Sequence, residues 1–372
     1  MNVLIISASM GAGHDGAARE LRRRLEARGH QVAVHDLLRA FPAGTGGVLR
    51  WSYQWQLRLA PWSYEASYRM WYRRPQGADL LATVLDVVVG RGIRGLVAAS
   101  EPDVVVSTYP LSSLVLGRDR LRRRLRVPAA TFVTDFAVHP LWVHRGIDLH
   151  LCVHPQAAAD AAARSGGAAV APGPLVPESF TSALPDRVRA RSALSLGGDD
   201  RIVLLVAGSW GVGDIEGTFA DVVATGRYTP LAVCGRNEGL RRRLTAMGGG
   251  RVLGWTDEMP VLMAAADGLV QNAGGLSCME AFAAGLPVVS YRPIAGHGRG
   301  NAEDMERAGV AAYVRTAEEL GPVLDEVTGP RRQALVDAGR AMFAGDAAED
   351  VVRLGSPAAA ALERAHDRAA WS

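Results

Sequence analysis

Short apolar runs bounded by glycine, proline and polar residues recur along the chain, and amphipathic segments of helical length separate them. This alternation predicts parallel β-sheets covered by helices. Two series of strands are expected. The first comprises 2–7, 31–35, 103–107, 129–133 and 148–153, and the second comprises 202–207, 231–234, 251–254, 268–271, 287–291 and 310–314.

A segment rich in proline and glycine, 171–177, separates the two series and predicts a linker. We therefore expect an α/β protein with two doubly wound, Rossmann-like domains that face a central cleft, and 372 residues suit such a pair. The expected boundaries are 1–172 for the first domain, 173–190 for the linker, 191–345 for the second domain and 346–372 for a helical tail. Where this tail packs stays open.

The composition, with 48% hydrophobic and 21% charged residues, is typical of a globular protein. Charged residues interrupt the most apolar stretch, 80–99, so no membrane span is expected. The N-terminus enters a strand at once, unlike a secretion signal. Three isolated cysteines, Cys152, Cys234 and Cys278, fit a reducing compartment. These features predict a cytoplasmic protein.

Charge is divided unequally between the two halves. Residues 1–172 carry 21 Arg and 13 acidic residues, whereas 173–372 carry 20 Arg and 25 acidic residues. All 41 basic residues are Arg, whose planar guanidinium suits phosphate groups. The first half is therefore expected to face an anionic membrane surface rather than a nucleic acid. A general bias toward Arg on exposed helices is the alternative.

A glycine-rich turn, 9–15, follows the first strand and leads into a helix expected at 16–28. Backbone N–H groups at such a helix start can bind an anion or a polar ligand. The turn lacks the GxGxxG pattern, which argues against a dinucleotide. His14 stands at its tip, where an imidazole can take a proton from an acceptor hydroxyl. A capping role or simple solvent exposure of His14 stays open.

Two further glycine loops occur in the second half. The loop 208–214 follows the first strand of the second series, and 272–277 leads into a helix that holds Glu280. Gly274 and Gly275 allow close approach of a diphosphate, and Glu280 can accept both hydroxyls of a ribose. The pattern predicts a nucleoside-diphosphate site that needs no metal. The alternative is an ordinary strand–turn–helix with an exposed glutamate.

Together these motifs resemble GT-B glycosyltransferases of the monogalactosyldiacylglycerol synthase and processive diacylglycerol glucosyltransferase group, which are related to the GlcNAc transferase of the peptidoglycan lipid precursor. The matching motifs lie at 11–14, 133–135, 139–142, 234–237, 272–287, 294–296 and 300–301. The resemblance implies an inverting enzyme whose first domain binds a lipid acceptor and whose second domain binds a UDP-sugar. No cofactor is expected.

The resemblance also assigns roles by position. His14 would be the acceptor-side base, and Asp135 is the other catalytic candidate. The donor-binding candidates are Gly208, Ser209, Gly211, Gly213, Arg236, Trp255, Asn272, Gly274, Gly275, Glu280, His297 and Asn301. The acceptor-binding candidates are Gly11, Gly13, Trp51 and Trp55.

Two departures from the family pattern concern the donor site. His297 and Gly298 stand where the family usually has a Gln-Glu or Gln-Gln pair that touches the donor sugar, which leaves the sugar open. Asn272 stands where relatives often have lysine, so Arg236 or Arg299 is expected to supply a cation near the diphosphate.

Four histidines at 139, 144, 150 and 154 lie close to Asp135 in the sequence. Imidazole and carboxylate groups can bind zinc, but no pair of these histidines falls on an HxxxH pattern within an expected helix, and Pro140 makes this segment a loop. No metal site is therefore expected. Asp135 is expected to orient a catalytic group or an acceptor hydroxyl, or else to cap a turn.

The segment 39–75 differs from the rest of the chain. It holds six Arg, one Glu and eight of the sixteen Trp and Tyr residues. Trp51 and Trp55 are one helical turn apart, and a break at Pro61 separates them from a second set at Tyr64, Tyr68, Trp71 and Tyr72. Two amphipathic helices that dock on a membrane are expected, with Arg50, Arg58, Arg69, Arg73 and Arg74 facing anionic lipid. Packing against the first domain is the alternative.

The leading interpretation is a UDP-sugar-dependent hexosyltransferase that acts on a hydroxyl of a membrane lipid such as diacylglycerol, at the inner face of the cell membrane. A glycosyltransferase with a soluble natural-product acceptor and a UDP-sugar 2-epimerase of the same fold are the alternatives. A binding module without activity is disfavoured because both His14 and Glu280 are present.

Overall fold

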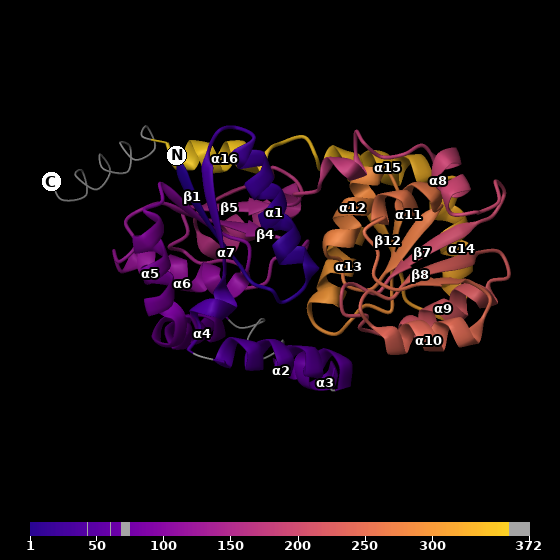
Figure 1. Cartoon of the computed structure of the whole chain (residues 1–372), viewed down its shortest axis with the longest axis horizontal. Helices are drawn as coiled ribbons and strands as arrows, with labels where there is room; N and C mark the ends of the chain where they lie inside the picture. The colour runs from indigo at the N-terminus through magenta and orange to yellow at the C-terminus, as the bar shows by residue number, and fades with distance from the viewer. Residues whose placement is uncertain (43, 60, 68–74, 357–372) are drawn as a thin grey trace.

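The computed structural model describes residues 1–42, 44–59, 61–67 and 75–356, and it contains two six-stranded parallel sheets, each flanked by helices (Figure 1). The first sheet has the order β2-β1-β3-β4-β5-β6 and the second has the order β12-β11-β10-β7-β8-β9. The first sheet comprises β1 (Asn2–Ser7), β2 (Gln31–Asp36), β3 (Val104–Ser107), β4 (Ala129–Val133), β5 (Leu149–Cys152) and β6 (Ala168–Val170). The second comprises β7 (Ile202–Val206), β8 (Thr229–Val233), β9 (Arg251–Leu253), β10 (Gly268–Gln271), β11 (Val288–Tyr291) and β12 (Ala311–Val314).

Helices cover both faces of each sheet, which explains why the central strands are continuous apolar runs. The first domain has α1 (Ala12–Glu26), α2 (Thr45–Leu59), α3 (Pro61–Ser67), α4 (Pro75–Leu85), a π-helical turn (Asp86–Gly90), α5 (Arg91–Ser100), α6 (Pro110–Leu121) and α7 (Pro155–Ser165). The second has α8 (Arg187–Ala193), α9 (Ile215–Ala224), α10 (Glu238–Met247), α11 (Met259–Ala265), α12 (Leu276–Ala284), α13 (His297–Arg307), α14 (Ala317–Thr328) and α15 (Arg332–Ala341).

The described strands include all eleven expected from the sequence, with ends that differ by at most two residues, so the α/β class is confirmed. The sequence missed β6, a short strand at the edge of the first sheet whose small, partly exposed residues leave little apolar signal. The expected start of the first helix was wrong. α1 begins at Ala12 rather than Gly16, because Gly11 adopts a φ of 145° and turns the chain directly into the helix.

The chain crosses between the two domains twice. After the linker it forms the second domain, and α16 (Ala347–Leu354) then packs back on α1 and β3 of the first domain. Asp346, which caps α16, forms ion pairs with Arg24 and Arg28 of α1. The part of the expected tail at 357–372 lies outside the described residues. No helix among the described residues is long and apolar enough to cross a membrane.

Candidate active site

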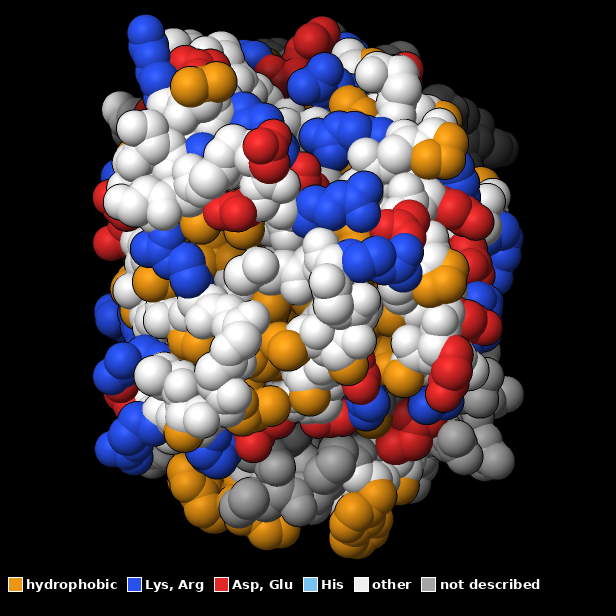
Figure 2. Space-filling view, turned by 90° about the vertical axis from the view of Figure 1, so that its right-hand side faces the viewer, with side chains coloured by type: hydrophobic (Ala, Val, Ile, Leu, Met, Phe, Trp, Pro, Cys, Tyr) orange, Lys and Arg blue, Asp and Glu red, His pale blue; other side chains and the backbone are white. Residues whose placement is uncertain are grey.

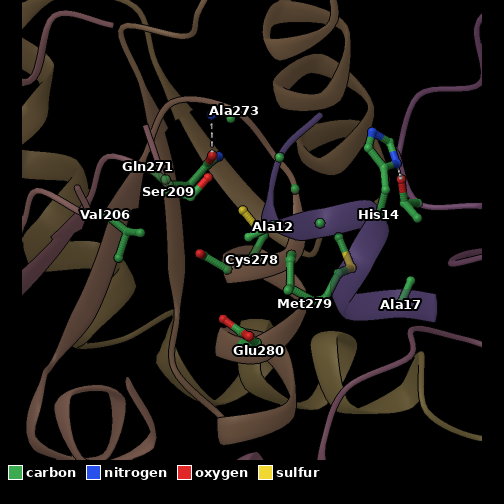
Figure 3. Close-up of a pocket in the computed structure, with 18 of the residues that line it drawn as sticks. Ala12, His14, Ala17, Val206, Ser209, Gln271, Ala273, Cys278, Met279 and Glu280 are labelled. Carbon is green, nitrogen blue, oxygen red and sulfur yellow. Dashed lines mark hydrogen bonds between the residues drawn. The ribbon is translucent and has the colours of Figure 1, made fainter. Parts of the chain in front are cut away.

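A cavity of about 420 Å³ lies between the two domains, and loops at the carboxyl ends of strands from both sheets line it (Figure 3). The first domain contributes the start of α1, and the second contributes the loop after β7 and the β10–α12 segment. This is the edge of a doubly wound sheet at which ligands bind. Both halves of the chain therefore contribute residues to one shared site.

The starts of α1 and α12 meet at this cavity. Gly16 packs so closely on Leu276 that a Cβ on Gly16 would lie 2.5 Å from the Leu276 Cδ2. Neither helix has a side-chain cap, since glycine occupies both capping positions, Gly11 and Gly275. Backbone N–H groups and the positive ends of two helix dipoles are thus available to an anionic or polar ligand.

His14 lies in the first turn of α1 and is partly buried, whereas the sequence suggested the tip of a loop. Its Nδ1 is 3.0 Å from the carbonyl oxygen of Thr108 and 3.1 Å from the Thr134 hydroxyl. A carbonyl only accepts, so the proton of a neutral ring is assigned to Nδ1. The lone pair then belongs to Nε2, as a general base requires.

Burial lowers the pKa of His14 below its usual value, which keeps the ring neutral and able to accept a proton at neutral pH. The charge of Asp135 opposes this effect. Asp135 itself accepts a hydrogen bond from Trp142 Nε1 at 2.8 Å, and its Oδ2 is 3.5 Å from His139 Nε2. Burial alone would raise the pKa of Asp135, but the His139 bond and the histidine charges lower it overall. Asp135 is therefore an ionised group placed to stabilise a protonated His14.

Glu280 lines the same cavity from the second turn of α12 (Figure 3). Burial raises its pKa to about 8, although the charge of Arg19 on α1 opposes the rise. The Glu280 carboxylate makes no hydrogen bond or ion pair with the part of the chain that the structure describes. A carboxylate left without a partner in an interior cavity costs stability, which marks it as a group held for a ligand.

The β10–α12 loop uses some of its own donors internally. Gln271 Oε1 accepts the N–H groups of Ala273 and Gly274 at 2.7 Å and 2.6 Å. A Cβ on Gly274 would lie 2.4 Å from the Asn301 Cβ, so this glycine serves the packing of α13. The start of α12 at Gly275 carries the backbone donors that remain for an anionic ligand.

Asn272 and Asn301 hold the cavity wall together. Asn272 Nδ2 donates to the carbonyl of Val212 at 2.9 Å and so fixes the loop after β7. Asn301 is fully buried, donates to the carbonyl of Ala273 at 2.9 Å and accepts the N–H of Ala137 from the first domain at 2.8 Å. Its amide thereby bridges the two domains. A contact between Asn301 and the donor stays a prediction.

The cavity brings together many of the candidates from the sequence. Those that line it are Gly11, Gly13, His14, Asp135, Gly208, Ser209, Trp255, Asn272, Gly275, Glu280 and His297. Those outside its lining are Gly211, Gly213, Arg236, Gly274, Asn301, Trp51 and Trp55. Arg236 instead stacks over the Trp255 ring, 4.5 Å from its centroid, where it holds the indole at the cavity rim.

Sequence reasoning missed Arg19 and Tyr53, which also line the cavity. Arg19 follows Gly16 by three positions, so helical spacing could have placed both residues on one face of α1. Only the packing of α1 on α12 shows that this face borders the cavity. Tyr53 lies on α2 and forms an edge-on ring contact with Trp210 at 5.9 Å. On α3, Glu65 accepts the N–H of Gly296 at 2.6 Å, so both helices of this arm contact the second domain.

The arm formed by α2 and α3 carries three exposed tryptophans. Trp51, Trp55 and Trp62 are 64%, 45% and 75% exposed. Two helices broken at Pro61 were expected, and the structure contains them, but Trp51 and Trp55 face solvent rather than the cavity. Arg50, also named for docking, is exposed on α2. The remaining side chains named for docking lie outside the described set: Arg58, Tyr64, Tyr68, Arg69, Trp71, Tyr72, Arg73 and Arg74.

The histidines near Asp135 have structural partners. His150 Nε2 accepts the N–H of His144, and His154 caps the start of α7. Across the described residues, no group of three or more His, Cys, Asp or Glu side chains is placed to hold a metal ion.

Comparison with known proteins shows which enzymes this chain resembles. Residues 14–167 match the family model of monogalactosyldiacylglycerol synthase. The processive diacylglycerol beta-glucosyltransferase of Bacillus subtilis (strain 168) is 25% identical over 341 residues, which cover 88% of this chain and 86% of the relative. The chain is a GT-B glycosyltransferase. The enzyme of the same description from Bacillus licheniformis is 25% identical over 334 residues.

Solved structures agree on the fold of this glycosyltransferase. MurG of Acinetobacter baumannii has a TM-score of 0.56 and 15% identity, covering 95% of this chain and 98% of MurG. Os79 from O. sativa in complex with UDP has a TM-score of 0.60 and 16% identity, covering 95% of this chain and 99% of Os79. The resemblance, the two-domain fold and the enzyme class expected from the sequence are thus confirmed.

His14→Ala is expected to lower turnover by roughly 100-fold or more, because general-base assistance would be lost. In the wild-type enzyme with saturating donor, kcat should rise with pH to a plateau, with a midpoint below pH 6.5, since burial lowers the pKa of His14 and the neutral ring is the active form. Steady-state kinetics from pH 5 to 8 measures both effects. His30→Ala is the control, because His30 lies outside the cavity. Normal turnover in the His14 variant would exclude it as the base.

Glu280→Gln is expected to stabilise the enzyme by a few kcal/mol at pH 9, because each unit of pKa shift corresponds to about 1.4 kcal/mol. The folded-state pKa of about 8 exceeds the usual 4.5, so the wild-type enzyme loses this stability as pH rises from 4.5 through 8. Denaturant unfolding at pH 4.5 and pH 9 should therefore show a higher free energy of unfolding for the variant than for the wild-type enzyme at pH 9 only. Glu303→Gln, on the exposed side of α13, should unfold with the wild-type free energy at both pH values. A more stable wild-type enzyme at pH 9 would contradict the unpartnered state of Glu280.

Proposed function

We propose that this glycosyltransferase moves a hexosyl unit from a UDP-sugar to a hydroxyl of a membrane lipid such as diacylglycerol, with inversion at the anomeric carbon. The observation that carries the proposal is the single cavity lined by His14 from one domain and Glu280 from the other. A base and a ribose-binding carboxylate on opposite walls suit an acceptor hydroxyl and a nucleotide donor that meet between them.

The donor has matching groups on the second domain. In the proposed complex, Glu280 accepts the ribose hydroxyls, the free N–H groups at the start of α12 bind the diphosphate, and the backbone near Trp255 contacts the uracil. Os79, a protein of the same fold, has been solved in complex with UDP, which supports UDP as part of the donor. His297 lines the cavity at the start of α13, and we propose that it contacts the donor sugar.

The proposed reaction is one displacement. The acceptor oxygen attacks the anomeric carbon while His14 Nε2 takes the hydroxyl proton, and the bond from that carbon to the phosphate oxygen breaks. Asp135 stabilises the imidazolium that forms, and the α12 donors stabilise the negative charge on the departing UDP. The proton that His14 holds is then released to solvent.

The lipid acceptor is proposed from the relatives named as diacylglycerol glucosyltransferases and from the surface of the first domain. Hydrophobic side chains protrude at the lower edge of the molecule in Figure 2, at the level of α2 and α3 in Figure 1. Leu80, Val84 and Val87 add an exposed apolar row at helical spacing, followed by the exposed Arg91. We place the enzyme peripherally on the inner face of the membrane, with this surface against anionic lipid.

A donor panel tests the proposal. UDP-glucose, UDP-galactose, UDP-GlcNAc and UDP-glucuronate are each supplied with and without diacylglycerol vesicles, and released UDP and lipid-bound sugar are measured. One UDP-sugar should give vesicle-dependent transfer that survives EDTA, because helix N-termini replace a cation. Glu280→Ala should lose on the order of 2 to 3 kcal/mol of UDP affinity. Transfer only to a soluble acceptor, or UDP release without transfer, would contradict the lipid proposal.

Replacing both Trp51 and Trp55 by Ala should weaken binding to anionic vesicles at least tenfold, since each interfacial ring contributes on the order of 1 kcal/mol. The melting temperature should fall by no more than a few degrees, because both rings are largely exposed. Vesicle co-sedimentation at low and high salt measures the effect, and wild-type binding should weaken with salt. Val188→Ala, an exposed apolar site on α8, is the control. Binding that ignores lipid charge would argue against this surface.

A further inference from the structure

Glu65 on α3 joins the α2–α3 arm to the loop that precedes α13, and the arm extends under the second domain in the view of Figure 1. Its Oε2 accepts the N–H of Gly296 at 2.6 Å, and its Oε1 lies 4.0 Å from Nη1 of Arg299. The Glu65 side chain is 20% exposed, whereas Gly296 is buried. A carboxylate of the first domain thus satisfies a buried backbone donor of the second.

Gly296 depends on this bond more than another residue would. It has a φ of 73° and a ψ of −116°, and it has no side chain with which to cap α13. Glycine can leave such a conformation at little cost, so an outside contact is needed to hold it. On the other side of the loop, the N–H of Ile294 donates to the carbonyl of Asn272 at 2.8 Å. The loop is therefore held by the second domain at Ile294 and by the arm at Gly296.

His297 follows Gly296 directly and lines the cavity from the first turn of α13. The next residue, Gly298, packs closely on the donor loop, since a Cβ there would lie 2.9 Å from the carbonyl oxygen of Asn272. This packing limits movement of the helix toward Asn272. The Glu65 bond acts on the peptide next to His297, so it helps to fix the direction in which the imidazole leaves the backbone.

We propose that Glu65 is a positioning residue for the donor sugar, which holds Gly296 so that the His297 side chain meets the sugar in the cavity. The inference rests on the proposed function, in which His297 contacts the donor sugar. Glu65 is not among the described residues that line the cavity, so it acts through the loop rather than on the substrate. The first domain thereby contributes to binding of the sugar through its α2–α3 arm.

This role affects the two parts of the donor differently. In the proposed complex, the UDP part is bound by Glu280 and the start of α12, neither of which Glu65 contacts through the Gly296 bond. Loss of Glu65 should therefore weaken binding of the UDP-sugar and spare binding of UDP. A general loosening of the domain interface would weaken both ligands, so the comparison separates positioning of the sugar from a structural role.

The test is calorimetry on the full-length enzyme without acceptor, with UDP and with UDP-glucose, UDP-galactose, UDP-GlcNAc and UDP-glucuronate. Glu65→Ala should bind the donor about tenfold more weakly, because a buried N–H loses its partner when the loop keeps its position. UDP affinity should change by less than about twofold, which also shows that the variant is folded. Glu65→Gln should stay within about threefold of the wild-type enzyme, since its amide oxygen still accepts the Gly296 N–H.

Glu178→Ala is the matched control. Glu178 also forms a contact between distant segments, an ion pair with Arg23 at 3.3 Å, but it is not among the described residues that line the cavity. This variant should bind UDP and the UDP-sugar as the wild-type enzyme does.

A double substitution tests whether Glu65 acts through His297. His297→Ala alone should weaken the UDP-sugar about tenfold, and adding Glu65→Ala should cost less than a further twofold, since the positioned side chain is gone. Equal losses of UDP and UDP-sugar affinity in Glu65→Ala, unchanged UDP-sugar binding in either single variant, or a further tenfold loss in the double variant would overturn the proposal. A wild-type enzyme that binds neither UDP nor any of the four UDP-sugars would instead refute the proposed donor, and this inference with it.

Discussion

The close contact between α1 and α12 is the constraint on which the site depends. Gly16 leaves room for Leu276, and this permits two helices from different domains to bring their uncapped starts to one cavity. A larger residue at Gly16 would force the end of the Leu276 side chain to shift, because a Cβ there would lie 2.5 Å from the Leu276 Cδ2. The catalytic geometry is therefore a property of the domain interface, and Asn301 reinforces it with a hydrogen bond to each side.

Burial of ionisable groups gives the two walls of the cavity different chemistry. On one wall, desolvation keeps His14 neutral, as a base must be before it reacts. On the other, desolvation opposes the charge of Glu280, and the enzyme retains this cost because a ligand can relieve it. In the proposed mechanism, the same physical effect thus prepares a proton acceptor for one substrate and a binding group for the other.

The α2–α3 arm connects the outer surface with the donor loops. Its tryptophans face outward, while Tyr53 contacts Trp210 and Glu65 contacts Gly296 on the second domain. The arm contacts solvent on one side and the loops at Trp210 and Gly296 on the other. A membrane bound to its tryptophans could therefore influence the site directly through these contacts.

The sequence by itself determined the two parallel sheets and the loops that carry His14 and Glu280, because strand periodicity and glycine turns are local signals. It did not reveal the short edge strand β6 or the helical position of His14, which depend on sheet pairing and on one glycine dihedral angle. Only the tertiary structure decided that Gly274 packs against Asn301 and that Arg19 faces Glu280's cavity. These contacts join residues that are distant in the chain. Side-chain packing between such segments produces no periodic pattern in the sequence of either one.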